Sequence, residues 1–217
     1  MKLAAGEVLN LSKAYAPVPG CTTSAIIASG NNRLWIFSLA AHTDISAEIF
    51  PYHKLLVVLQ GKLEVYGKAG LLTTVGIGES CITPTDIPVG MRSNEDTIYL
   101  EVEVGRDFTM NKAVEAGKVF RLADLLPYQD GKIVNMDVAH NEKMKFVVMS
   151  FGAGTGLSEH AAPGEALLFA LDGEGIIGYE GKEHTLKAGE QFHFAKGGLH
   201  YVKAEKPFKM ALLLTLE

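Results

Sequence analysis

The chain of 217 residues repeats itself after about half its length. When the sequence is shifted by 112 residues, the middle of each half aligns with the other without a gap. Identical residues meet in this alignment, among them Ser38 and Ser150, Thr43 and Thr155, Pro51 and Pro163, Leu55 and Leu167, and Gly61 and Gly173. A period of this length is too long for one unit of a solenoid. It indicates a duplicated whole domain, and we place the two predicted domains at residues 1–107 and 108–217.

Short apolar runs in each half predict strands. The runs at 34–39, 55–59, 80–83 and 98–104 have counterparts at 146–151, 166–171, 191–194 and 210–216. Gly61 and Gly173 follow the second run of each half, and we expect each to form a turn that stops the strand. One short helical turn is expected at 122–128, because Pro127 stops a helix there. Many short strands with frequent Gly and Pro predict an all-β sandwich or barrel.

Composition excludes several classes of protein. Apolar residues make up 47% of the chain and charged residues 21%, as in globular domains. The net charge is −5 and no cluster of Lys and Arg is present, so we expect no nucleic-acid partner. The N-terminus lacks the apolar core of a signal peptide, and no apolar run is long enough to span a membrane. The expected location is the cytoplasm. Cys21 and Cys81 match no metal or redox spacing and are predicted to be free thiols.

The second half resembles the cupin family. Residues 154–173 contain a Gly, then His160, Glu165 and the closing Gly173, and they resemble the first cupin motif. Residues 189–200 contain a Gly, a Gly-Gly turn and His200, and they resemble the second. The resemblance implies an all-β fold of two tandem cupin barrels, each a double-stranded β-helix or jelly roll. It also implies a homodimer, because cupins often pair through apolar outer sheet faces.

The resemblance also implies where ligands would bind. The family's metal ligands are three His and one Glu, and His160 and His200 stand at the first and last of these positions. Ala162 and Ala166 stand at the other two, and Glu165 lies one residue early. Glu165 points inward only if it still belongs to the loop, because strand side chains alternate. Two interpretations stay open: a divalent transition metal (Zn, Ni, Fe or Mn) held by His160, His200 and Glu165, or two pocket histidines without metal.

Aromatic residues complete the predicted pocket. The family pattern places Phe192 and Phe194 on the interior, where they would form its wall. Alternation then directs His193 to the other face, as a surface or inter-sheet histidine. His184 lies in polar surroundings and is expected to be solvated.

The first half has lost the ligand positions altogether. Glu48, Phe50, Lys54 and Val89 occupy them. Phe and Val cannot bind a cation, and Lys54 would repel one if it faces inward. We therefore expect no transition metal in the first domain, and we interpret it as a structural partner of the second.

Three functions remain open at this stage. The first is a metal-dependent enzyme that polarises a small oxygenated substrate. The second is a module that binds or senses a small molecule without metal, and the two Ala replacements favour it because they enlarge the pocket. The third is a purely structural or assembly role for the pair of domains, which the lost ligand positions of the first half favour for that half only. Fold does not choose among them.

Overall fold

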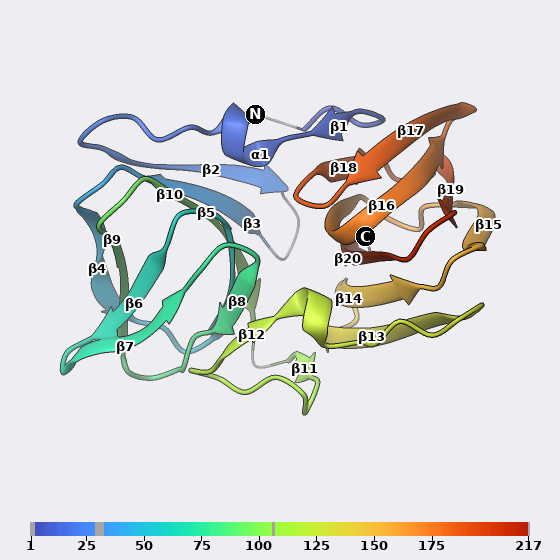
Figure 1. Cartoon of the computed structure of the whole chain (residues 1–217). Helices are drawn as coiled ribbons and strands as arrows, with labels where there is room; N and C mark the ends of the chain where they lie inside the picture. The colour runs from blue at the N-terminus through green and yellow to red at the C-terminus, as the bar shows by residue number, and fades with distance from the viewer. Residues whose placement is uncertain (1–2, 29–32, 106, 217) are drawn as a thin grey trace. The chain divides into compact units, whose positions relative to one another are not determined.

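The computed structural model describes residues 3–28, 33–105 and 107–216, and these fold almost entirely into strands (Figure 1). The helical segments among them are α1 (Leu11–Ala14) and the 3-10 helix η1 (Leu122–Asp124). The predicted all-β class is confirmed, whereas α1 was not predicted. None of the helices in this part of the chain has the length and apolar character needed to cross a membrane. Cys21 is exposed, Cys81 is buried, and both are free thiols as predicted.

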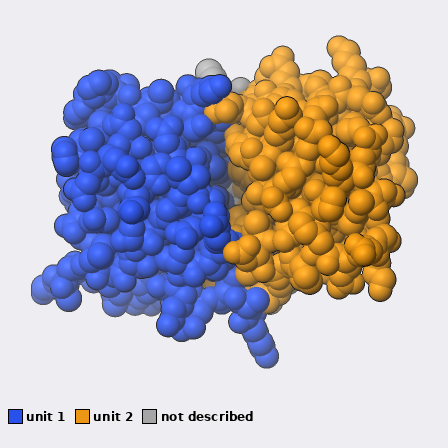
Figure 2. Space-filling model, viewed as in Figure 1, with its two compact units in different colours: residues 1–2, 11–108, 112–121 blue, residues 3–10, 109–111, 122–217 orange. Residues whose placement is uncertain are grey.

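The chain divides into two compact units, which Figure 2 colours separately. Unit 1 contains residues 11–108 and 112–121, and unit 2 contains residues 3–10, 109–111 and 122–216. The units are therefore not two consecutive stretches of chain. The N-terminal strand β1 (Val8–Leu9) belongs to unit 2 because it pairs with β18, and β12 (Val119–Arg121) belongs to unit 1 because it pairs with β8.

Unit 1 consists of two antiparallel sheets. The six-stranded sheet has the order β12, β8 (Glu79–Ile82), β5 (His53–Gln60), β10 (Thr97–Val104), β3 (Leu34–Leu39) and β2 (Thr22–Ala28). The four-stranded sheet has the order β4 (Thr43–Ile49), β9 (Pro88–Ser93), β6 (Leu63–Gly67) and β7 (Gly70–Val75). Its apolar core draws on both sheets, with Leu56 and Tyr99 from the first and Val65 and Met91 from the second.

The strands of unit 2 are also paired antiparallel, but they form one branched sheet. One path runs through β1, β18 (Gln191–Phe194), β16 (Ala166–Tyr179), β20 (Phe208–Thr215), β14 (Met144–Phe151), β13 (Ile133–His140) and β11 (Thr109–Met110). Off this path, β15 (Thr155–Ala161) pairs with β19 (Leu199–Ala204), and the second half of β16 pairs with β19 and with β17 (Lys182–Lys187). Its core gathers side chains from both branches.

Gly173 does not end a strand, contrary to the sequence expectation. β16 continues through it, pairing with β20 up to Gly173 and with β17 from Glu174 onward. The backbone φ of Gly173 is 74°, a value that Gly adopts without strain, so the strand bends there from one branch to the other. Gly61 has a similar φ of 72° but does separate β5 from β6.

The strand register repeats at the offset that the sequence indicates. Leu39 is the Cα partner of Thr97, as Phe151 is of Phe208. The offset between these pairs is 112 residues in the first strand and 111 in the second, because one residue is dropped between them. Equivalent positions of the two units can therefore be compared residue by residue.

Candidate functional site

Unit 2 brings the two predicted histidines together with a tyrosine. His200 on β19 is the Cα partner of His160 on β15 and of Tyr179 on β16. Directly opposed residues of antiparallel strands project to the same face, so the three side chains form one row. The imidazole centroids of His160 and His200 are 4.2 Å apart.

Each imidazole is fixed by a hydrogen bond to the backbone two residues before it. Nδ1 of His160 lies 2.9 Å from the carbonyl oxygen of Ser158, and Nδ1 of His200 lies 3.1 Å from that of Gly198. A carbonyl oxygen can only accept, so each Nδ1 carries the hydrogen. In the neutral ring, Nε2 then keeps its lone pair and can accept a hydrogen bond from a ligand.

Burial keeps the inner imidazole neutral. His200 is buried whereas His160 is exposed. Burial lowers the pKa of His200, and the nearby His160 lowers it further, although the hydrogen bond to Gly198 acts in the opposite direction. At neutral pH, His200 is therefore an acceptor through Nε2 and carries no charge.

Aromatic rings line the buried side of the row. The ring of Phe194 lies 4.4 Å from that of His200, and Phe192 lies 5.1 Å from Phe194, centroid to centroid. Tyr179 lies 5.8 Å from both phenylalanines. Phe192 and Phe194 are fully buried in the core of unit 2, and Ala162 is buried with them.

Glu165 does not join the two histidines. Its carbonyl oxygen accepts hydrogen bonds from the backbone nitrogen and the hydroxyl of Thr215, at 2.9 and 3.1 Å, so its backbone is already paired with β20 one residue before β16 begins. Side chains alternate along such a ladder, and Ala166 belongs to the core. The side chain of Glu165 is therefore directed away from the interior.

The donors of this site do not fit a resident catalytic metal. Within residues 3–28, 33–105 and 107–216, no three His, Cys, Asp or Glu side chains are arranged to hold an ion. The predicted set of His160, His200 and Glu165 is thus not assembled. Two imidazole nitrogens remain, fewer than the three protein ligands that a catalytic zinc ion normally has.

The neighbouring histidines have structural positions. His193 is buried, not on the surface, and its carbonyl oxygen accepts a hydrogen bond from the backbone nitrogen of Gly6. His184 was expected to be solvated, but it lies on β17 and its ring packs 5.1 Å from that of Phe192. The polar sequence around His184 gave no sign of this contact, because β17 and β18 both pair with β16 and not with each other.

In unit 1 the equivalent positions have different chemistry. Glu48 and Val89 are Cα partners, as His160 and His200 are in unit 2. Lys54 faces inward: it is buried, and its Nζ lies 2.9 Å from Oε1 of Glu101 and 3.7 Å from the ring centroid of Phe50.

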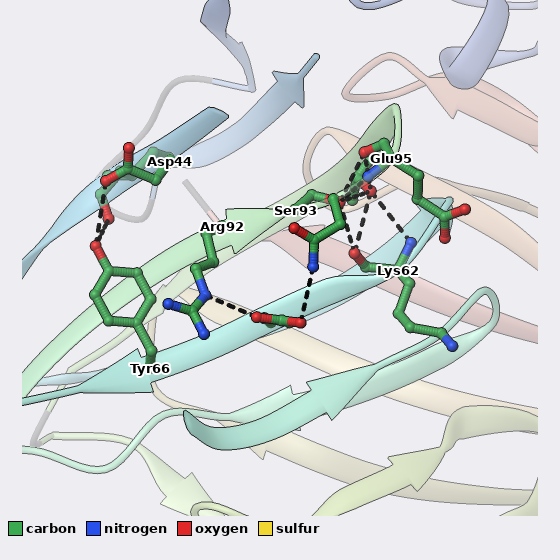
Figure 3. Close-up of polar contacts among 10 residues, drawn as sticks. Asp44, Lys62, Tyr66, Arg92, Ser93 and Glu95 are labelled. Carbon is green, nitrogen blue, oxygen red and sulfur yellow. Dashed lines mark hydrogen bonds and ion pairs between the residues drawn. The ribbon is translucent and has the colours of Figure 1, made fainter. Parts of the chain in front are cut away.

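The other end of the β4–β9 pair in unit 1 carries a polar network in which Ser93 and Thr97 are buried (Figure 3). The hydroxyl of Ser93 lies 2.7 Å from that of Thr97, and both reach backbone oxygens of the adjacent turns. Arg92 pairs with Glu64, Nε to Oε2, at 2.7 Å. A hollow of about 380 Å³ beside them is lined by Lys62, Glu64, Asn94 and Glu95. These contacts give the polar groups of the turn hydrogen-bond partners, and we assign them a structural role.

Comparisons with known proteins support the cupin superfamily. Residues 147–216 match the cupin domain family. A cupin 2 conserved barrel domain protein from Leptotrichia buccalis has a similar structure, with a TM-score of 0.86 and 26% identity over 98% of each chain. No similar sequence was found among curated proteins.

Two enzymes share the fold at lower identity. An oxalate decarboxylase from Bacillus subtilis aligns with a TM-score of 0.53 and 13% identity, covering 98% of this chain and 78% of the enzyme. Salicylate 1,2-dioxygenase from Pseudoaminobacter salicylatoxidans aligns with a TM-score of 0.59 and 12% identity, covering 84% and 70%. At such identities the likeness establishes the fold and leaves the reaction open.

Proposed function

From the premise of a cupin fold, we propose that the chain is a tandem pair of cupin barrels whose second barrel binds a small hydroxylated molecule without a resident metal. The observation that carries the proposal is the row of His160, His200 and Tyr179. The two imidazoles lie on one face, and each ring is held in place by a hydrogen bond from Nδ1 to the backbone. A homodimer remains a prediction from the family resemblance.

The ligand class follows from the protonation of the site. The neutral imidazole of His200, which donates through Nδ1 to the backbone, can only accept through Nε2, so the ligand must supply an O–H or N–H donor to it. The rings of Phe194 and Tyr179 give one side of the site an apolar surface, which suits a small ring or short carbon chain. A charged carboxylate ligand would find no donor at Nε2 of the neutral His200 imidazole.

The test is a titration followed by the side-chain ¹⁵N signals of the histidines. Catechol and 1,2-propanediol serve as hydroxylated probes, and acetate serves as the anionic control. We expect the hydroxylated probes to shift the Nε2 signals of His160 and His200 in the native protein. A His160→Ala/His200→Ala double variant should lose this binding, and His140→Ala should retain it because His140 lies outside the row.

A metal titration tests the main alternative, which is a metal-dependent cupin. A Bacillus subtilis oxalate decarboxylase that is similar in fold has Mn(II) centres, so Mn(II) and Zn(II) are the ions to test. We expect calorimetry to show only weak binding, because two protein ligands hold an ion poorly. Stoichiometric, tight metal binding that disappears in the double variant would overturn the metal-free proposal in favour of a metal-dependent cupin.

A further inference from the structure

Residues 3–9, which we call the β1 arm, lie against the strand that carries two aromatic residues of the proposed site. β1 pairs with the edge of β18 that faces away from β16, and β18 carries Phe192 and Phe194 (Figure 1). Ahead of β1, the backbone N–H of Gly6 donates to the carbonyl oxygen of His193 at 3.0 Å. All of these contacts lie within unit 2. The function proposed above gives this arm no role.

Gly6 packs directly against Tyr179, which belongs to the row of the proposed site. A Cβ atom added at position 6 would lie 2.9 Å from two carbon atoms of the Tyr179 ring. Nonbonded carbon atoms prefer a separation of about 3.5–4.0 Å, so a side chain at this position has no room. The φ of Gly6 is 80°, in the left-handed region that favours glycine. The Tyr179 ring therefore lies against the backbone of the arm at a place where only glycine fits.

The opposite edge of the Tyr179 ring contacts the turn that precedes β19. The Tyr179 hydroxyl accepts a hydrogen bond from the backbone N–H of Ala195 at 3.4 Å. A Cβ atom added at Gly198 would lie 2.8 Å from the hydroxyl oxygen. The carbonyl oxygen of Gly198 also accepts the Nδ1 hydrogen of His200. Direct contacts thus join Gly6, through the tyrosine ring and the turn, to the buried imidazole.

The second repeat has an arm of the same kind, but its glycine meets no tyrosine. Gly117 has a φ of 81°, and its N–H donates to the carbonyl oxygen of Ile82 at 2.7 Å, as expected from an offset of 111 residues. β12 follows and pairs with β8, as β1 pairs with β18. Gly67 stands at the position of Tyr179. Among the described residues, no atom lies within 4 Å of a Cβ added at position 117, so docking of the arm does not require the ring contact.

We propose that the β1 arm is part of the ligand site of unit 2, with Gly6 as the positioning residue that holds Tyr179 beside His160 and His200. This inference rests on the function proposed above and extends it to the choice of ligand. The Tyr179 ring is held at both edges, so the apolar side of the site is fixed before a ligand arrives. A preorganised flat surface favours a flat hydroxylated ring over a flexible diol.

The test compares Gly6→Ala with Gly117→Ala in the full chain. Both variants place a Cβ on a backbone with almost the same φ, 80° and 81°, but only the first places it against Tyr179. We expect Gly6→Ala to weaken catechol binding about tenfold in calorimetry and to weaken 1,2-propanediol binding less. Gly117→Ala should leave both affinities unchanged. A general loss of folding in unit 2 would reduce both affinities alike.

Two further measurements do not depend on those affinities. In the ligand-free protein, Gly6→Ala should shift the backbone amide signal of Ala195 and the Nδ1 signal of His200, and Gly117→Ala should shift neither. In the native protein, catechol should slow hydrogen exchange of the Gly6 amide and not of the Gly117 amide, because coupling between ligand and arm is reciprocal.

A compensating substitution shows whether the ring carries the effect. Tyr179→Leu removes the ring atoms that the new Cβ meets. We therefore expect Gly6→Ala/Tyr179→Leu to bind catechol as Tyr179→Leu alone does, so that the loss caused by Gly6→Ala disappears in this background.

The outcomes separate this inference from the function on which it rests. If the native protein binds neither probe, the proposed function fails, and the ligand-free signals of Ala195 and His200 still decide whether the arm positions Tyr179. Unchanged signals in a natively folded Gly6→Ala variant, checked by circular dichroism, would overturn the inference. Equal losses of catechol binding in Gly6→Ala and Gly117→Ala would also overturn it, because strain in the arms would then explain both.

Discussion

The two units place their polar side chains on different walls of an otherwise equivalent interior. In unit 2 the polar row of His160, His200 and Tyr179 lies on the β15–β19–β16 branch. In unit 1 the polar wall lies on β5 and β10, with Lys54 and Glu101 at its centre.

At the positions equivalent to these polar side chains, the other unit is apolar or lacks a side chain, except at Glu48, which is exposed. The positions of Lys54, Glu101 and Glu103 are filled in unit 2 by Ala166, Leu212 and Leu214. The positions of His160, His200 and Tyr179 are filled in unit 1 by Glu48, Val89 and Gly67. Polar groups in a core are costly unless they are paired, so each interior retains one polar wall while the other supplies the apolar packing. The two units therefore differ in the chemistry of their interior side chains.

The largest effect on stability is expected when polar side chains on β5 and β10 of unit 1 are replaced by the residues at the equivalent positions of unit 2. Lys54→Ala copies Ala166 but leaves Glu101 charged and nearly fully buried without its cation. Removing one partner of a buried ion pair costs about 3–5 kcal/mol. Urea unfolding followed by Trp35 emission measures the stability of unit 1, because Trp35 is the only tryptophan.

The double variant tests whether the pair itself stabilises unit 1. Lys54→Ala/Glu101→Leu copies both residues of unit 2 and removes the unpaired charge. We expect it to recover most of the lost stability, since an apolar replacement of a buried pair is often neutral. If the double variant is as unstable as Lys54→Ala, then lost packing of the lysine chain, and not the stranded carboxylate, explains the loss.

A smaller effect on stability is expected at a Tyr–Gly pair that both units contain. The tyrosine and the glycine lie on opposite strands of the pair in the two units. Tyr66 on β6 opposes Gly90 on β9, whereas Gly178 on β16 opposes Tyr201 on β19. A Cβ at position 90 would lie 2.8 Å from backbone atoms of β4, but one at 178 would meet only the ring of Tyr201. Backbone cannot move aside as a side chain can.

We therefore expect Gly90→Ala to destabilise its unit by about 2–3 kcal/mol and Gly178→Ala by about 1 kcal/mol. Backbone hydrogen exchange of β9 and β19 measures the two losses separately. Equal losses would show that the tyrosine ring, which approaches both glycines, sets the cost at both positions.

Most of the fold could be predicted from the sequence because apolar runs of strand length recur at one offset. β3 and β18 have the predicted bounds, and five of the other expected strands differ by one or two residues at an end. The strand expected at 166–171 continues to Tyr179 as β16. The assignment of β1 to unit 2 could not be predicted. This strand is only Val8–Leu9, and it forms because β18 offers it an edge. The bend at Gly173 was mistaken for a turn because a positive φ suits both.

The site could be predicted only where a motif marks it. The spacing of His160 and His200 carried the cupin resemblance, so their approach was expected. Tyr179 belongs to no motif, and only the pairing of β16 with β19 brings it to His200. Glu101 and Glu103 did carry a signal that was not used: charged residues at alternate positions of an apolar strand indicate one polar, inward face.

The smallest expected effect concerns the pH dependence of unit 2, which unit 1 should lack because Val89 replaces the histidine. Burial holds the pKa of His200 below its ordinary value, so the unfolded chain binds more protons than the folded one in this range. Stability therefore rises with pH through this window and falls as the pH drops below the ordinary pKa of His, about 6.5. We expect protection of the β15 and β19 amides, corrected for intrinsic exchange, to be weaker at pH 5.5 than at pH 7.5. His200→Val, which copies unit 1, should flatten that dependence, and His140→Gln should leave it intact. A slope that persists in His200→Val would assign the proton to His160 or to another group, and the two units would then differ in the chemistry of their interior side chains without differing in their response to acid.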